Sequence, residues 1–258
     1  MPRHRAAAAL AAVLTAVALV MPARTASAAA AHDPVIIVPG MTGTTSYMST
    51  MRQNFVRAGW PDDRAITWTD RTSMTGDLTQ AGQAMGQEVD RVLRQTGAQK
   101  VILVTWSAST LAARSYLKHV PGAQDKVSHY FSMAGPHHGT TTASMCRNLY
   151  TSCRQFAIGS PWLRDLNSGT EVPGSPAVRY TTLRSTCDWN VNPSQSAELA
   201  GADNRLTPTC IDHSRFPHDT GVFNLINKII QENPGTATRR PARTPSQYGH
   251  AVTTNAPR

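Results

Sequence analysis

Ser107 is the residue of this sequence that is best placed to do chemistry. It follows an unbroken apolar run at 101–106 and is followed at once by a helical pattern over 108–119. Such a run is typical of a strand that is buried on both faces of a parallel sheet. A serine on the sharp turn between such a strand and a helix lifts its hydroxyl clear of the sheet, beside the first amides of the helix. The pattern predicts a nucleophilic serine.

The turn around Ser107 departs from the usual G-x-S-x-G motif, because it has Thr105 and Ser109 at the glycine positions. Both residues are small, as the close passage of strand and helix requires. Ser109 is the alternative nucleophile, but bulky Leu111 would then occupy the second small position, so we prefer Ser107. An ordinary strand-to-helix turn is the competing interpretation.

A serine hydroxyl needs a histidine base, and the histidine needs a carboxylate. In folds built around such a turn, the acid and then the histidine follow the serine along the chain. Asp188 lies just past an expected strand, and His213 lies just past the last one. We predict the triad Ser107, Asp188 and His213, with His218 as the alternative base.

Two backbone N–H groups must hold the negative charge that develops on the attacked carbonyl oxygen. Ala108 follows the serine and supplies one. The other is expected from the loop after the first strand, where Gly40 permits a close approach and Met41 carries the N–H group. A plain glycine-rich turn is the competing interpretation of this loop.

Strand patterns alternate with helix patterns along the chain, which indicates an α/β fold with a parallel sheet and right-handed crossovers. Sites in such sheets lie beyond the carboxyl ends of the strands, where Ser107 is expected. The strands are expected at 34–38, 65–68, 101–106, 127–133, 178–183 and 207–211, and the helices at 47–58, 77–93, 108–119 and 222–230.

The two ends of the chain have compositions of their own. Residues 1–28 combine a basic start, an alanine-rich apolar stretch and Ala26-Ser27-Ala28, which predicts a signal peptide cleaved near Ala28 and a secreted protein. A retained anchor is the alternative. We expect the catalytic domain over 29–232 and a mobile basic tail over 233–258.

The formal net charge of +9 falls to +6 if the three arginines of the signal peptide are removed. A basic exterior favours anionic surfaces or transient contact with lipid interfaces. The sequence has no basic helix with interleaved aromatic residues, so we expect no nucleic-acid partner. His137 and His138 are adjacent rather than spaced like metal ligands, so we expect no metal and no cofactor. We expect a monomer.

The four cysteines of an exported chain predict two disulfides, for which three connectivities exist. We favour Cys187 with Cys210, because this bridge would join the loop of the acid to the loop of the base. Cys146 with Cys153 would then close a short loop near the site. An apolar segment over 141–166 is expected above the site, with Leu149, Phe156 and Trp162 as candidate acyl-chain contacts.

Several stretches resemble the secreted class 2 bacterial lipases of the α/β-hydrolase superfamily: HDPVIIVPG at 32–40, TGAQKV at 96–101, AGPHHGT at 134–140 and GSPWLRDLN at 159–167, followed by Asp188 and His213. The Pro39-Gly40 turn and the T-W-S start of the serine turn look like those of fungal lipase-B-type enzymes.

The resemblance implies an extracellular triacylglycerol lipase or carboxylesterase that needs no cofactor. It implies an α/β-hydrolase fold with a minimal, mostly parallel sheet of about six strands and little or no cap. It also implies Ser107, Asp188 and His213 as triad, with Met41 and Ala108 as oxyanion donors. An acyltransferase or a polyester or cell-envelope esterase is the alternative on the same fold. A non-catalytic secreted binding protein with an altered serine turn is the alternative of another class.

Overall fold

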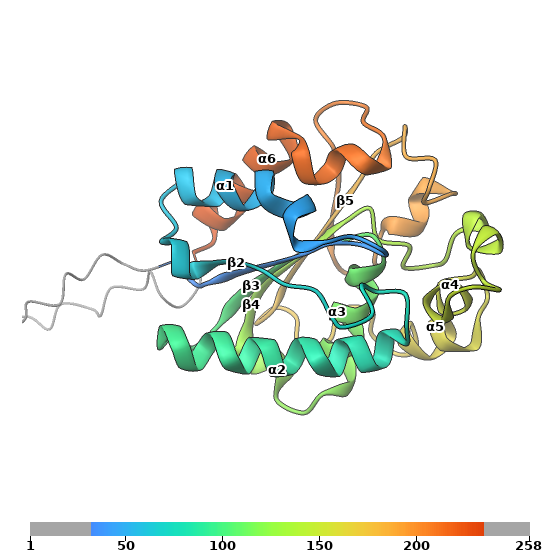
Figure 1. Cartoon of the computed structure of the whole chain (residues 1–258), viewed down its shortest axis with the longest axis horizontal. Coiled ribbons are helices and arrows are strands. Elements are labelled where there is room, and N and C mark those ends of the chain that lie inside the picture. Colours follow the sequence, from blue (N-terminus) through green and yellow to red (C-terminus); the bar gives the residue numbers. More distant parts are fainter. Residues whose placement is uncertain (1–31, 235–258) are drawn as a thin grey trace, which may run out of the picture.

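The structure is a computed structural model that describes residues 32–234. The expected signal peptide and the tail from residue 235 lie outside the described residues. The described chain forms one sheet with helices on both faces (Figure 1). Its strands are β1 (Val35–Val38), β2 (Ala65–Thr67), β3 (Val101–Trp106), β4 (Val127–Met133), β5 (Arg179–Arg184) and β6 (Asp203–Leu206).

The six strands are all parallel and lie in the order β2-β1-β3-β4-β5-β6. The chain moves outward from β1 to β2 and then returns to the other side of β1 for β3. The order of the strands therefore reverses between β1 and β3, and a crevice at such a switch point is where open parallel sheets bind ligands. The loop after β1 and the serine turn after β3 both lie there.

Helices cover both faces of the sheet (Figure 1). The α-helices are α1 (Ser49–Arg57), α2 (Leu78–Thr96), α3 (Ala108–His119), α4 (Thr151–Gln155), α5 (Pro161–Leu166) and α6 (Thr220–Glu232). Short 3₁₀ helices lie at Thr45–Met48, Asp62–Arg64, Ala123–Lys126, Thr141–Met145, Ser194–Ala197 and His213–His218. Helices α1 and α6 pack on one face, and α2 and α3 pack on the other.

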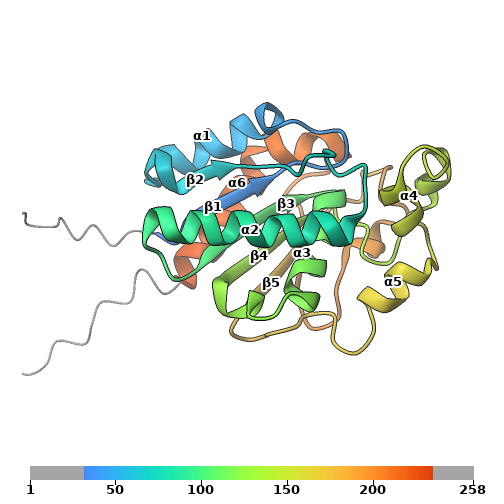
Figure 2. The same cartoon turned by 60° about the horizontal axis from the view of Figure 1, so that its bottom comes forward.

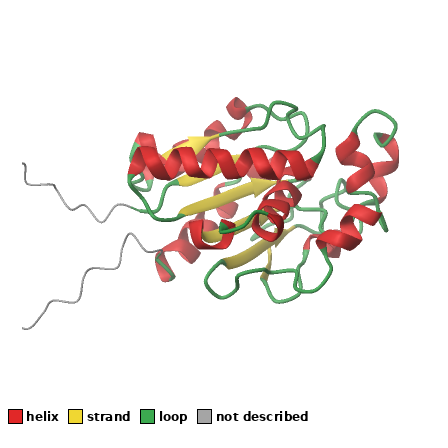
Figure 3. Ribbon diagram, turned by 90° about the horizontal axis from the view of Figure 1, so that it is seen from below, coloured by secondary structure: helices red, strands yellow, loops and turns green. Residues whose placement is uncertain are grey.

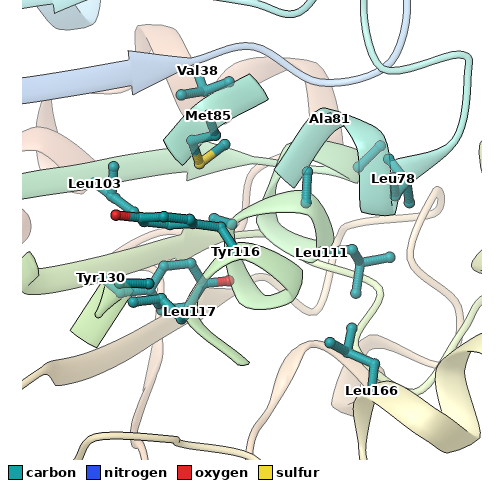
Figure 4. Packing of buried hydrophobic residues seen from close by; sticks show 14 of the residues in the cluster. Val38, Leu78, Ala81, Met85, Leu103, Leu111, Tyr116, Leu117, Tyr130 and Leu166 are labelled. Carbon is teal, nitrogen blue, oxygen red and sulfur yellow. The ribbon is translucent and has the colours of Figure 1, made fainter. Parts of the chain in front are cut away.

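The alternation of strand side chains divides the core into two layers. Val35 and Ile37 of β1 face α1 and α6, whereas Ile36 and Val38 face α2 and α3. Figure 4 shows the second layer, where Met85 of α2 lies between the helix and the sheet. Because both faces of the strand are covered, β1 is apolar at every position, as the sequence predicted.

Local signals set the ends of α2. The Asp77 carboxylate accepts hydrogen bonds from the amides of Thr79 and Gln80, which caps the amino end of the helix. Gly97 takes the left-handed conformation that ends it. The helix lies close to α3, since a Cβ on Gly82 would stand 2.7 Å from the Ala112 carbonyl oxygen. This contact holds α3, and thus the serine turn, against the core.

The last strand differs from the prediction. We expected it at 207–211, but β6 covers Asp203–Leu206 and only one further hydrogen bond, from Thr207 N–H to the Arg184 carbonyl, follows it. Pro208 has no N–H group to continue the ladder. All four residues of β6 are exposed at the sheet edge, so the strand lacks the apolar pattern by which we identified the others.

The segment over 141–166, which contains α4 and α5, lies beyond the carboxyl ends of the strands (Figures 1 and 2). It consists of short helices and loops, as the colouring by secondary structure shows (Figure 3). No large cap covers the sheet in the described chain. None of the helices between residues 32 and 234 is long and apolar enough to cross a membrane.

Candidate active site

Ser107 occupies a strained turn between β3 and α3. Its φ of 59° and ψ of −129° lie outside the regions that ordinary residues adopt. The Ser107 N–H donates to the Met133 carbonyl of β4 at 2.9 Å, which helps to hold this conformation. The turn presents the Ser107 hydroxyl to His213, whose Nε2 atom lies 2.9 Å from Oγ.

His213 joins Ser107 to Asp188. The Nδ1 atom of His213 lies 2.8 Å from Asp188 Oδ2, and both side chains are nearly buried. The other carboxylate oxygen, Oδ1, accepts hydrogen bonds from the amides of Asn190 at 2.8 Å and Val191 at 3.1 Å. A continuous hydrogen-bonded chain thus runs from a hydroxyl through an imidazole to a fixed carboxylate.

His218, the alternative base, lies elsewhere. Its Nδ1 atom is 3.3 Å from the Thr50 hydroxyl, and its ring packs edge-on against Tyr47. His213, by contrast, is linked to the end of β3, because the Trp106 indole N–H donates to the His213 carbonyl at 3.1 Å. Of the two histidines, the structure brings only His213 to Ser107.

The loops that carry Asp188 and His213 are joined twice. The disulfide Cys187–Cys210 links them, and the Ser185 hydroxyl accepts hydrogen bonds from the amides of Cys187 and Ile211 at 3.1 and 3.0 Å. The second disulfide is Cys146–Cys153, so the pairing is the one that we favoured from the sequence. Each link limits the drift between two groups that must stay within hydrogen-bond distance.

The loop after β1 lies directly against Ser107. A Cβ on Gly40 would stand 2.7 Å from the Ser107 Cβ, so only glycine allows this approach. Met41 follows and lines the cleft beside the serine, with its sulfur 3.5 Å from the Cys153 sulfur. Ala108 is the first residue of α3, where the amides of a helix have no intrahelical acceptor.

The three hydroxyl residues around the serine turn all have backbone partners. The Thr105 hydroxyl donates to the Phe131 carbonyl at 2.8 Å, and the Thr110 hydroxyl donates to the Ser107 carbonyl at 2.6 Å. Ser109 is fully buried and its hydroxyl contacts the backbone of both β3 and β1. The polar groups that replace the usual glycines are therefore accommodated without an unsatisfied hydroxyl.

A cleft of about 280 Å³ opens in front of the Ser107 hydroxyl. Of the three candidate acyl-chain contacts, Phe156 lines it. Leu149 is exposed outside it, and Trp162 packs on the core with its indole N–H on the Thr79 hydroxyl. The lining residues are Met41, Ser107, Pro136, Thr140, Thr142, Met145, Cys146, Phe156, Asn190, Val191 and His213.

Sequence reasoning did not identify Pro136, Thr140, Asn190 or Val191 as part of the cleft. Pro136 and Thr140 belong to the stretch after β4, and Asn190 and Val191 follow the acid. The available signal was position: each pair comes just after a strand or its loop, at the carboxyl edge where the site was expected.

Two adjacent histidines hold the loop after β4. His137 is fully buried, its Nε2 atom lies 2.7 Å from the Ser132 hydroxyl, and burial lowers its pKa well below the usual range, so the ring is neutral. His138 pairs with Glu171 at 2.8 Å, and this hydrogen bond raises the pKa of His138. Within residues 32–234, no cluster of histidine, cysteine and carboxylate side chains is suited to hold a metal ion.

Two solved structures show how this fold compares with known proteins. Lipase B of Aspergillus fumigatus is 21% identical with a TM-score of 0.66, and the match covers 81% of this chain and 55% of that one. The mature form of the Bacillus licheniformis lipase BlEst2 is 17% identical with a TM-score of 0.59, and the match covers 78% of this chain and 91% of that one. These likenesses confirm the α/β-hydrolase fold.

The sequence itself also matches a family model. The model of the class 2 lipases matches residues 32–209, a range that includes Ser107 and Asp188 and ends shortly before His213. This range is more than half of the chain and agrees with the resemblance found in the sequence. The chain belongs to the class 2 lipase family of carboxylic ester hydrolases.

Proposed function

We propose that the protein is a secreted serine ester hydrolase, a triacylglycerol lipase or carboxylesterase, that acts through Ser107, His213 and Asp188. The observation that carries the proposal is the hydrogen-bonded chain of these three side chains, which ends at the mouth of the cleft. Hydroxyl, imidazole and carboxylate in this geometry are the components of nucleophilic acyl transfer.

In the first half of the reaction, the Ser107 oxygen attacks the ester carbonyl while His213 Nε2 takes its proton. Asp188 holds the Nδ1 proton of the imidazole and stabilises the imidazolium that forms. The amides of Met41 and Ala108 stabilise the tetrahedral oxyanion. The imidazolium then gives its proton to the leaving alcohol, and the ester carbon stays bonded to Ser107 as an acyl-enzyme.

In the second half, water replaces the alcohol. His213 removes a proton from the water as it attacks the acyl-enzyme carbonyl, and the same two amides stabilise the second oxyanion. Collapse of this intermediate breaks the bond to Ser107, whose oxygen recovers the proton from His213. The products are the carboxylic acid and the regenerated serine.

An exposed apolar rim supports transient contact with lipid. Met145, which lines the cleft, is 83% exposed. Leu149, whose N–H donates to the carbonyl of the cleft residue Cys146, is 76% exposed, and Trp189, next to the acid, is 80% exposed. Apolar side chains at the mouth of a site are suited to enter the surface of a lipid aggregate. The two disulfides support export to an oxidising compartment, as the signal peptide expected from the sequence also does.

The test compares the mature protein with Ser107→Ala on p-nitrophenyl esters of short and long acyl chains. We expect hydrolysis by the wild-type protein and a loss of at least about 10³-fold in the variant. The profile over chain length separates a lipase from a small-ester esterase, and transfer of the acyl group to an added alcohol identifies an acyltransferase. A folded wild-type protein that hydrolyses none of these esters refutes the proposal and favours the binding-protein alternative.

A further inference from the structure

We infer that Ser109 is a positioning residue for the proposed reaction, because its hydroxyl fixes the nucleophile turn relative to the oxyanion loop. The Ser109 oxygen accepts a hydrogen bond from the Trp106 N–H at 3.0 Å. It also lies 3.1 Å from the Val38 carbonyl oxygen and 2.9 Å from the Trp106 carbonyl oxygen, and its single hydroxyl proton is shared between these two acceptors. One side-chain atom thus bridges β3 and β1.

The bridged backbone groups lie next to the reacting groups. Trp106 immediately precedes the nucleophile, Ser107. Val38 ends β1 and is three residues before Met41, whose N–H we assign to the oxyanion hole. The bridge therefore lies at the carboxyl ends of β1 and β3. The loop after β1 carries the Met41 amide, and the turn after β3 carries the nucleophile.

Burial gives this bridge its influence. Ser109 is fully buried, so no solvent competes for its hydrogen bonds. An oxyanion donor must lie close to the position that the negatively charged oxygen will occupy, and a misplacement of about 1 Å costs about 10²-fold in rate. Glycine, the usual residue here, has no side chain and cannot make such a bridge.

Ser128 offers a matched control. Its buried hydroxyl also joins two strands, since Ser128 Oγ of β4 lies 3.3 Å from the Val101 carbonyl oxygen of β3. Val101 is the first residue of β3, so this bridge lies at the amino edge of the sheet, away from the cleft. Ser128→Ala therefore removes a comparable hydrogen bond without changing a residue near the cleft.

The experiment measures kcat, KM, melting temperature and inhibition by an alkyl boronic acid, which forms a tetrahedral adduct on serine. We expect Ser109→Ala and Ser109→Gly to lower kcat by about 10- to 100-fold, with KM within about twofold of the wild-type value. Binding of the boronic acid should weaken by a similar factor, because the adduct needs the aligned oxyanion hole. Ser128→Ala should keep the wild-type kcat, and Ser109→Thr, which retains the hydroxyl, should recover activity over Ser109→Ala.

Either of two results overturns the inference: a kcat for the Ser109 variants that matches that of Ser128→Ala, or a loss confined to KM. If Ser109→Ala does not fold, Ser109→Gly decides the question, because glycine is the residue that this turn usually carries. The inference rests on the proposed function, but different results refute the function and the role of Ser109. An inactive wild-type protein refutes the function, whereas an active one with unaffected Ser109 variants refutes only the role of this hydroxyl.

Discussion

Replacing Asp188 by asparagine tests the triad most sharply, because the change keeps the shape of the side chain and removes one acceptor. The carboxylate now serves two groups of donors. Oδ2 accepts from His213 Nδ1, and Oδ1 accepts from the amides of Asn190 and Val191. An asparagine has a single oxygen and must leave one group without an acceptor.

The structure indicates which group is left without an acceptor. Two backbone amides compete with one imidazole, so the asparagine oxygen should stay with Asn190 and Val191. Its NH₂ group then faces His213 Nδ1, which becomes an acceptor and moves the imidazole proton to Nε2. That proton points at Ser107, and the histidine can no longer act as a base. Leaving the buried Val191 amide and the part-buried Asn190 amide unsatisfied costs about 2–4 kcal/mol, so the competent arrangement is populated to only about 1 part in 30 to 1 part in 1,000.

Loss of the negative charge adds to this effect, since nothing then stabilises the imidazolium. The total should approach the roughly 10⁴-fold fall in kcat that this substitution causes in other serine triads. The assay is hydrolysis of p-nitrophenyl butyrate at saturating concentration, with the melting temperature measured in parallel.

Asp212→Asn is the matched control, because this exposed carboxylate immediately precedes His213 and accepts a hydrogen bond from the Ser214 amide instead. We expect its kcat to remain within about threefold of the wild-type value, because the asparagine oxygen can still accept from the Ser214 amide and cap the 3₁₀ helix that begins at His213. A folded Asp188→Asn protein that retains a tenth or more of the wild-type kcat would refute the assignment of Asp188 as the acid.

Three further perturbations have definite expected results. Gly40→Ala should abolish activity in a protein that still folds, because its Cβ would stand 2.7 Å from the Cβ of the nucleophile; wild-type rates would contradict the close approach. Leu149→Ser should lower hydrolysis of emulsified triacylglycerol several-fold and spare soluble esters, because Leu149 is exposed and does not line the cleft; equal losses on both would exclude a role at the interface. Glu171→Gln should lower the melting temperature more at pH 5.5 than at pH 9. The pKa of His138 is raised by this pair, so its stabilisation is present below the ordinary pKa of 6.5 and is lost as pH rises through the folded value. The pKa of Glu171 is lowered, so its stabilisation is present above 4.5 and is lost only in acid; equal changes in melting temperature at the two pH values would exclude the ion pair.

The sequence predicted the central part of this fold because the central strands are covered on both faces. Strands β1 and β3 are apolar or nearly so, and β4 is buried along its whole length; their ends are marked by small or breaking residues, and their predicted bounds differ from the structure by at most one residue. The exposed edge strand β6 carries no such pattern, so its position was wrong. A strand that is buried on both faces has an apolar sequence by which it can be predicted, and an exposed edge strand such as β6 does not.

The candidate site was partly predictable for a related reason. Chain order is a one-dimensional property and pointed to Asp188 and His213 before any geometry was known. The end of β5 also pointed to Asp188, whereas the strand expected just before His213 ends earlier, at Leu206. The wall of the cleft depends on which loops meet in space, which is why Thr140 and Asn190 were missed although they are hydrogen-bonded to each other, through the Thr140 hydroxyl and the Asn190 carbonyl at 2.7 Å. Fifty residues separate these two groups in the chain.

The altered serine turn shows how a departure from a motif should be interpreted. The motif has glycines because the strand and the helix pass close together, and that requirement concerns volume rather than chemistry. Thr105 and Ser109 meet it because each side chain is small and its hydroxyl has a backbone partner, the Phe131 carbonyl and the Val38 carbonyl respectively. Since Ser109 does so between the two strands that flank the switch point, the substitution that weakened the motif in sequence adds a connection in the structure that glycine cannot provide.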